Sequence, residues 1–320
     1  MSTEVRVRTS HARLGSGSAL LRILDAKSNP GSRHPAGYDC GGTLTTVGRG
    51  GHMKPKIVVI GGSGLIGAMV VEKLKQKGND AVAAPPDTGV YTMSGEGSLG
   101  ALGGAEVVVD VANAPTLEDQ AAWDFFQIVG ENLAAAEVAD AINFFRTAHE
   151  NLAAAELAAG VKHHVALSVV GTERLQDLAY FRAKLLQENI IKGSPVPHTI
   201  IRASLVFEYV RGIAQSGTDG DTVRVSHSSF QPMAAEDVAS AVAEVAVEAP
   251  RNGAVEIAGP DMFYVDELVA KVLEHDKDPR NMVMGDPGGL FYGIQLDDQA
   301  LMPGRDARLG STTFDRWLTH

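Results

Sequence analysis

Cysteine is almost absent from this sequence: Cys40 is the single one among 320 residues, which excludes a disulfide framework or a thiolate zinc site within one chain. Long apolar runs are also missing, and none approaches the ~18 residues that a membrane-spanning helix needs. Basic residues are outnumbered, with 28 Lys and Arg against 39 Asp and Glu and a net charge of −11. Nucleic acid and anionic membranes attract basic surfaces, so we expect neither as a partner. Hydrophobic residues make up 44% of the chain, enough for a substantial core, and we expect a cytoplasmic protein.

The first 52 residues differ in composition from the rest of the chain. They are rich in Gly, Ser, Thr and Arg and hold seven Lys and Arg against three Asp and Glu, which leaves the remainder with a net charge of −15. We predict that residues 1–52 form a disordered extension and that residues 53–320 form the folded domain. Three origins are open for the extension: a targeting peptide, an upstream extension of the reading frame ahead of Met53, or vector sequence, because residues 51–53 resemble a tag scar. The upstream extension and the vector sequence are favoured over the targeting peptide.

The most informative stretch covers residues 56–74. A mostly β-branched run, 56–60, leads directly into Gly61, Gly64 and Gly67, and an amphipathic segment begins at Leu65. This order of strand, glycine turn and helix is typical of a dinucleotide phosphate site. The first glycine allows the tight turn, the second lets a phosphate approach the backbone, and the third lets the helix pack closely on the strand. The N–H groups and positive dipole end of the helix then face a pyrophosphate.

Strand and helix patterns alternate from Lys56 to about residue 203. Strands are expected at 56–60, 80–84, 106–112, 164–168 and 198–202, and helices at about 65–77, 117–159 and 178–192. The strands are continuous apolar runs, which indicates burial on both faces, so the alternation predicts a doubly wound parallel α/β sheet. The later pattern is looser, with helices at about 236–248 and 265–275 and a short one at 313–318. We expect a small C-terminal substrate-binding cap from about 203–230 and 255–320.

A tandem duplication interrupts the long helical segment. Phe125-Phe126 followed by residues 131–137 recurs, with an offset of 19 residues, as Phe144-Phe145 followed by residues 150–156. Nineteen residues advance a helix by five turns and about 100°, so in one straight helix the two copies would face different directions. We expect the second copy to keep the core position and the first to break away, with a bend near Asp140–Asn143.

A second chemical pattern lies on the helix predicted at 178–192. Tyr180 and Lys184 are four residues apart and so point from one face. A nearby ammonium group favours the phenolate and is expected to lower the pKa of the tyrosine, which can then protonate a carbonyl oxygen as hydride reaches its carbon. Ser168 ends the preceding strand and could hydrogen-bond the same oxygen. Tyr-x-x-x-Lys alone is a weak motif, and the upstream glycine turn is what gives it weight.

The sequence resembles the atypical short-chain dehydrogenase/reductases in several stretches. These are the glycine turn, the strand end at 113–115, the segments 167–171 and 201–203, and the C-terminal stretches 230–239 and 257–260. The most similar group is the NmrA-like NAD(P)H-binding proteins, and the resemblance covers about residues 53–320. It implies a Rossmann sheet, Tyr180 as proton donor with Ser168 beside it, and Lys184 on the nicotinamide ribose. It also implies that residues 202–207 line the substrate end. The cofactor contacts that it implies are Gly61, Ser63, Gly64, Leu65, Ile66, Gly67, Asp87, Thr88, Ala112, Asn113, Lys184 and Ala203.

The resemblance implies NADP or NAD as cofactor, with NADP slightly favoured. The local chemistry leans weakly toward NAD, because Asp87 is the one acid near the end of the second strand and no arginine lies between Met53 and Arg146. We expect an NAD(P)-dependent oxidoreductase acting on a small carbonyl, alcohol or enone substrate. The alternatives are a non-catalytic dinucleotide sensor that binds a partner protein and, third, an epimerase or dehydratase. Monomer and homodimer are both left open.

Other polar positions carry weaker signals. His163 and His164 precede a strand without a third ligand at a metal-like spacing, so we expect a structural role and no metal site. Asp110 lies within a buried strand and is expected to cap a neighbouring backbone group. Asp237 looks like a residue at the start of a helix.

Overall fold

The structure is a computed structural model that describes residues 54–84, 98–112 and 135–319. All of these belong to the unit His52–His320. The predicted extension, residues 1–52, lies outside the described residues. Within the described part of the chain, no helix is long and apolar enough to cross a bilayer.

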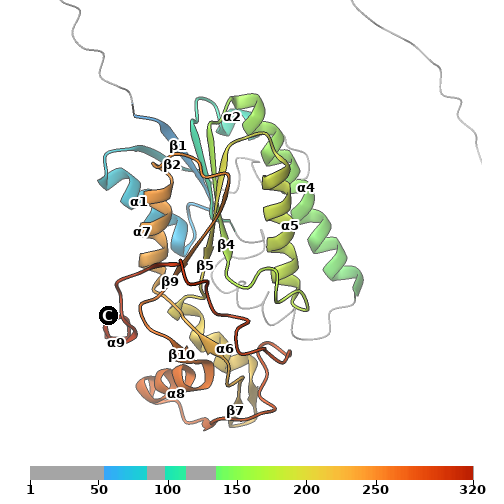
Figure 1. Cartoon of the computed structure of the whole chain (residues 1–320), viewed down its shortest axis with the longest axis vertical. Coiled ribbons are helices and arrows are strands. Elements are labelled where there is room, and N and C mark those ends of the chain that lie inside the picture. Colours follow the sequence, from blue (N-terminus) through green and yellow to red (C-terminus); the bar gives the residue numbers. More distant parts are fainter. Residues whose placement is uncertain (1–53, 85–97, 113–134, 320) are drawn as a thin grey trace, which may run out of the picture. The chain divides into compact units, whose positions relative to one another are not determined.

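A seven-stranded sheet organises the described residues (Figure 1). Its order is β12-β9-β5-β4-β3-β1-β2, and every neighbouring pair is parallel. The bounds are β1 Lys56–Ile60, β2 Asp80–Ala84, β3 Val107–Asp110, β4 His163–Val169, β5 His198–Ala203, β9 Gly253–Ala258 and β12 Arg308–Leu309. The chain runs from β1 outward to β2 and then crosses to the other side of β1 to form β3. This confirms the doubly wound sheet and places its switch point between the carboxyl ends of β1 and β3, where ligands bind in such sheets.

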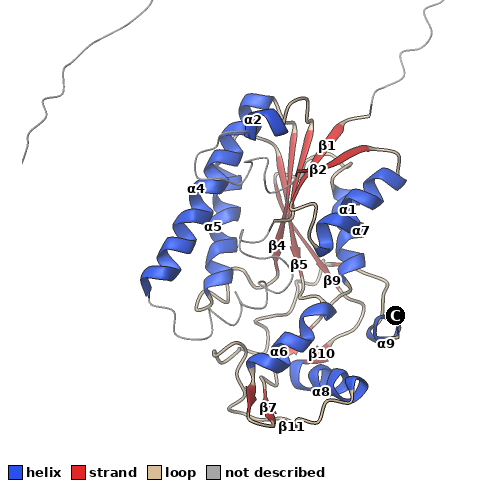
Figure 2. Ribbon diagram, turned by 180° about the vertical axis from the view of Figure 1, so that it is seen from behind, coloured by secondary structure: helices blue, strands red, loops and turns tan. Residues whose placement is uncertain are grey.

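Helices cover both faces of the sheet (Figures 1 and 2). On one face, α1 (Leu65–Gln76) packs against α7 (Ala235–Val245), and on the other α4 (Ala135–Ala159) packs against α5 (Ala179–Gly193). Ile57 and Val59 contribute to the core beneath α1 and α7, whereas Val58 and Ile60 join the core on the opposite face. Both faces are buried, which is why the strand sequences are continuous apolar runs. The short α2 (Ser98–Ala101) lies next to α4.

The second copy of the duplicated segment contributes core residues from α4. Leu152 and Ala155 are buried in the core cluster with β1 and β3, as expected for the copy that leads into β4. The helix is continuous through Asp140–Asn143, so the chain does not leave the helix at the position expected for a bend. Most of the first copy lies outside the described residues.

The C-terminal part builds a second apolar cluster around Phe207, Phe230, Phe291 and Phe314. Its sheets are β11-β7-β6 and β10-β8. The elements are η2 Phe207–Tyr209, α6 Val210–Ser216, β6 Thr218–Asp219, β7 Thr222–Arg224, β8 Ser229–Phe230, β10 Phe263–Tyr264, α8 Val265–Asp276, β11 Asn281–Val283 and α9 Phe314–Leu318. One difference from the expected cap is that β9 and β12, which fall partly or wholly within 255–320, pair with β5 and with each other in the main sheet.

Candidate functional site

The glycine turn follows β1 at the switch point of the sheet. Gly61 has a φ of +75°, a left-handed conformation that side chains disfavour. A Cβ atom on Gly61 would lie 2.8 Å from the Cα atom of Ala112, which follows β3. Glycine is therefore required here both by the turn and by the close approach of the two strand ends.

The other two glycines of the motif differ in what surrounds them. A Cβ atom on Gly67 would lie 2.0 Å from the carbonyl oxygen of Gly61, so the absent side chain lets α1 pack directly on the turn. Among the described residues, a Cβ atom on Gly64 would meet only that same oxygen, at 3.5 Å, which is ordinary contact. Gly64 is the N-cap of α1, and it is exposed together with Ser63 and Leu65. The first turn of α1 thus presents its N–H groups at an open surface, the arrangement that binds phosphates.

Gly62 is a further glycine that the turn requires, and it was not among the glycines predicted from the spacing of the motif. A Cβ atom there would lie 2.7 Å from the Cβ atom of Ala83 on β2. The two consecutive glycines at 61 and 62 were the available signal, since each faces a different neighbouring strand.

Lys184 connects the glycine turn to α5. Its Nζ atom donates to the carbonyl oxygens of Leu167, at 3.1 Å, and Ala112, at 3.5 Å, and to Oε1 of Gln187, at 3.2 Å. Ala112 is the residue whose backbone lies against Gly61. Burial lowers the pKa of Lys184 to about 8, against the opposing effects of Asp110 and Glu188.

A buried carboxylate lies behind this lysine. Oδ2 of Asp110 accepts a hydrogen bond from Nε2 of Gln187 at 2.8 Å and lies 3.3 Å from Nε2 of His149, while Oδ1 accepts from the Ala112 N–H at 3.1 Å. The last contact confirms that Asp110 caps a neighbouring backbone group. Burial by itself would raise the pKa of Asp110, but the hydrogen bond and charge of His149, with His164 and Lys184, lower it to about 2.

Tyr180 is half-buried near Lys184. The Lys184 Nζ atom lies 5.9 Å from the centroid of the tyrosine ring, and Phe181 packs edge-on at 5.5 Å. Burial raises the pKa of Tyr180, and Tyr209 raises it further. The expectation that the ammonium group lowers this pKa is therefore wrong for the protein as described, because desolvation of the phenolate is the largest effect on it.

Ser168 is hydrogen-bonded to α5. Its Oγ atom donates to Oε1 of Glu188 at 2.7 Å. Arg202 donates two hydrogen bonds to the same carboxylate, from Nε to Oε1 at 2.9 Å and from a terminal nitrogen to Oε2 at 2.6 Å. Burial would raise the pKa of Glu188, but hydrogen bonds from Arg202, Ser168 and Lys192 lower it. The hydroxyl hydrogen of Ser168 is thus directed at Glu188.

The remaining predicted contacts fall into three groups. The Arg202 side chain, expected at the substrate end, turns instead to Glu188 because that carboxylate is buried and needs a cation. Ala203 is buried in the core with Val206, and its carbonyl oxygen accepts the Val170 N–H at 2.9 Å. Asp87, Thr88 and Asn113 lie outside the described residues.

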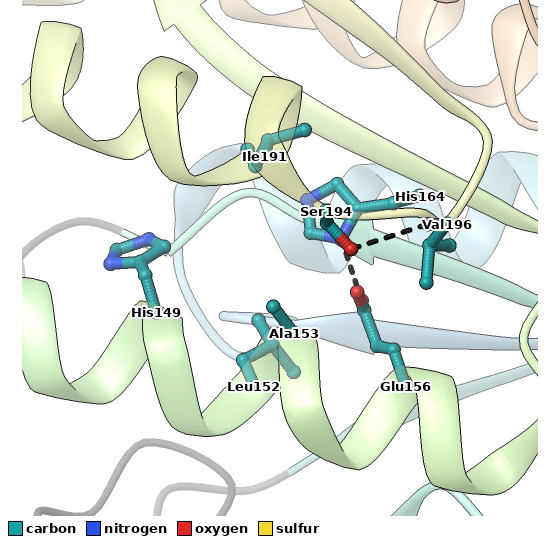
Figure 3. A pocket seen from close by; sticks show the side chains of 8 residues that line it. All are labelled: His149, Leu152, Ala153, Glu156, His164, Ile191, Ser194 and Val196. Atoms are coloured by element: carbon teal, nitrogen blue, oxygen red, sulfur yellow. Dashed lines mark hydrogen bonds and ion pairs between the residues drawn. The ribbon is translucent and has the colours of Figure 1, made fainter.

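The two histidines at the start of β4 make separate contacts. Nδ1 of His164 lies 2.6 Å from Oε1 of Glu156, and Nε2 of His163 lies 2.9 Å from Oγ1 of Thr199. Burial lowers the pKa of His163 to about 4, whereas Glu156 and Asp110 raise that of His164 against the effect of burial. Figure 3 shows the His164–Glu156 pair in a pocket lined by His149, Leu152, Ala153, Glu156, His164, Ile191, Ser194 and Val196. Among the described residues, no cluster of three metal-ligating side chains occurs.

Comparison with known proteins gives structural matches only. No family model and no curated protein sequence matches the chain. An NADPH-dependent quinone oxidoreductase from Escherichia coli, in complex with NADPH, is 16% identical, with 82% of this chain and 99% of that chain covered and a TM-score of 0.56. The chain has a Rossmann fold.

Two further matches have the same fold. The Bordetella bronchiseptica enzyme WbmG, in complex with NAD, is 17% identical over 85% of this chain and 94% of its own, with a TM-score of 0.56. A UDP-N-acetylglucosamine 4-epimerase from Bacillus cereus is 17% identical over 73% and 90%, with a TM-score of 0.51. The quinone oxidoreductase and the 4-epimerase catalyse different reactions, so the shared fold does not identify a substrate.

Proposed function

We propose that the protein is an NAD(P)-dependent oxidoreductase that transfers hydride between nicotinamide and a small carbonyl, alcohol or enone. The observation that carries the proposal is the contact of Lys184 with Ala112, whose backbone lies against Gly61. It brings the Tyr180–Lys184 pair of α5 next to the glycine turn of β1, although 72 residues separate Lys184 from Ala112. A phosphate site and a tyrosine–lysine pair at one switch point are what nicotinamide redox chemistry needs.

The described residues fit a dinucleotide. The pyrophosphate would lie over the first turn of α1, where Ser63, Gly64 and Leu65 are exposed and Gly64 leaves the backbone open. Ile66 and the turn glycines 61 and 67 would complete this phosphate site, and Ala112 would lie beside the cofactor. The family resemblance also supports cofactor contacts by Asp87, Thr88 and Asn113. Residues from Ala203 to Phe207 would line the nicotinamide end. The structural matches include complexes with NAD and with NADPH, so both cofactors stay in the proposal.

The chain's own residues would handle the proton. The bound nicotinamide cofactor supplies or accepts the hydride. Tyr180, whose raised pKa keeps it protonated at neutral pH, would donate its proton to the carbonyl oxygen in the direction of reduction. Lys184 would hold the nicotinamide ribose and favour the phenolate left behind. Ser168 would assist only after its hydroxyl turns from Glu188.

We place the protein with the NmrA-like group of atypical short-chain dehydrogenase/reductases on the sequence resemblance. The test is oxidation of NADPH and NADH by the full chain over a panel of aldehydes, ketones, quinones and enones. Turnover with at least one substrate is expected. Saturable dinucleotide binding without turnover on the whole panel would replace the proposal with the non-catalytic sensor.

A further inference from the structure

Three described residues offer Lys184 a hydrogen-bond acceptor, and one of these acceptors is a side chain. Leu167 and Ala112 offer backbone carbonyl oxygens, whereas Gln187 offers the oxygen of its amide, 3.2 Å from Nζ. Lys184 is 3% exposed and Gln187 is fully buried. A buried ammonium group depends on such acceptors, because transfer out of water is costly unless each N–H finds a partner.

The amide of Gln187 is fixed in one orientation by its two neighbours. Its Oε1 faces an ammonium group that can only donate, and its Nε2 faces the Asp110 carboxylate at 2.8 Å, which accepts. Rotation of the amide by 180° would put N–H against N–H and oxygen against oxygen. Asp110 is itself fixed by the Ala112 N–H and by His149.

We propose that Gln187 is a positioning residue for Lys184, oriented by Asp110, and that the pair sets where the ammonium group lies for the nicotinamide ribose. This inference rests on the proposed function, because it concerns how Lys184 meets a bound dinucleotide. Neither Gln187 nor Asp110 touches the cofactor in this account. They act through Lys184, so loss of the Gln187 amide weakens dinucleotide binding while the Asp110 contact with the Ala112 N–H stays in place.

The charges around Lys184 make its titration a direct readout. The lysine and its amide partner are surrounded by Asp110 on β3, Glu188 on α5 and His149 on α4. Tyr180 lies one helical turn away. The charge of His164 acts on Asp110, and that of Arg202 acts on Glu188. Burial lowers the pKa of Lys184 to about 8. Dinucleotide affinity should therefore fall as the pH rises through about 8 and the ammonium group loses its proton.

The experiment measures the Kd of NADPH and NADH by fluorescence from pH 6.5 to 9.5 on the full chain. Gln187→Met removes the acceptor and keeps the bulk, so Kd at pH 7 should rise about tenfold and the pH midpoint should fall by about one unit. The double variant Asp110→Asn/Gln187→Glu exchanges amide and carboxylate without changing total charge. It places a carboxylate next to Lys184, so the midpoint should rise above that of the wild type.

The matched control is Thr199→Val, which removes a fully buried hydroxyl from β5 that bonds His163 and the Arg251 N–H. It should lower Tm while leaving Kd and the pH midpoint unchanged. A lower pH midpoint in Gln187→Met and a higher one in Asp110→Asn/Gln187→Glu support the inference. A general loss of packing would not shift the midpoint in opposite directions in the two variants. If the wild type binds dinucleotide but both variants keep its midpoint, the inference fails and the proposed function stands. If the wild type binds neither cofactor at any pH, both fail.

Discussion

The Nζ atom of Lys184 lies 3.5 Å from the carbonyl oxygen of Ala112, and the backbone of Ala112 lies against Gly61. A helix that begins at Ala179 is thereby joined to a turn that ends at α1. The contact exists because β1 and β3 end side by side at the switch point, where the chain reverses its direction of winding, and β4 lies next to β3.

Tyr180→Phe should lower turnover by about 10²- to 10⁴-fold and leave the Kd of the dinucleotide within about twofold. The hydroxyl supplies the proton but no required binding contact. Steady-state kinetics with the best substrate of the panel and a fluorescence titration measure the two quantities. Tyr264→Phe in the C-terminal part is the matched control and should keep full activity. Unchanged turnover in Tyr180→Phe would remove Tyr180 from its assigned role.

Ser168→Ala should lower turnover by about tenfold or less, far below the effect expected for Tyr180→Phe. The hydroxyl donates to Glu188 at 2.7 Å, so its loss affects that carboxylate before any substrate. The free energy of unfolding should fall by about 1 kcal/mol, as for one hydrogen bond. Kinetics and urea denaturation of the same preparation check both values. A loss of turnover equal to that of Tyr180→Phe would show that the serine meets the substrate directly.

The turn glycines 64 and 67 should respond differently to alanine. Gly67→Ala places a methyl group 2.0 Å from the Gly61 oxygen and should destabilise the fold by at least about 3 kcal/mol. In the part of the chain that the structure describes, Gly64→Ala meets nothing closer than 3.5 Å, so Tm should stay near that of the wild type. Its methyl group nevertheless occupies the path of a pyrophosphate, and Kd should rise about tenfold or more, a change of about 1.4 kcal/mol.

Gly193→Ala is the control for both alanine variants, because no described residue lies within 4 Å of the added carbon. Thermal denaturation and dinucleotide titration of the three proteins separate the roles. Equal dinucleotide affinity in Gly64→Ala and the wild type would contradict a phosphate site at this turn.

The buried pair of His164 and Glu156 should make stability depend on pH. Glu156 and Asp110 raise the pKa of His164 above its ordinary 6.5. The stabilisation is therefore complete below about pH 6.5 and is lost as the pH rises through the raised pKa. Urea denaturation at pH 5.5, 7 and 9 should show a difference between wild type and Glu156→Gln that shrinks with rising pH.

Glu244→Gln removes an exposed carboxylate 3.5 Å from Lys77 and serves as the control for Glu156→Gln. Its effect on the free energy of unfolding should be below about 1 kcal/mol. A difference between Glu156→Gln and the wild type that stays constant from pH 5.5 to 9 would show that the pair does not titrate as described.

Local sequence was sufficient for the elements that build the sheet. The β-branched run before Gly61 and the glycine spacing placed β1, the turn and α1, because these signals involve neighbouring residues. Two-residue strands such as β8, β10 and β12 were missed, since so short a strand is defined by its partner and leaves no periodic pattern.

The side-chain partners at the candidate site could be predicted only in part. Gln187 and Glu188 lie three and four residues after Lys184 and so share its helix face, a signal that was available. No local signal shows that Arg202 turns to Glu188, or that His149 reaches Asp110 from α4, because these contacts join distant elements. The direction of the Tyr180 pKa also depended on burial, which spacing alone does not give.

Dinucleotide binding at the glycine turn is measured by isothermal titration calorimetry of the full chain with NADPH and NADH at pH 7, where Lys184 is protonated. We predict one saturable site per chain for at least one of the two, with Kd in the ~1 μM to 1 mM range typical of substrates, and much weaker binding by Gly64→Ala. Absence of binding for both dinucleotides, or binding that Gly64→Ala leaves unchanged, would contradict it.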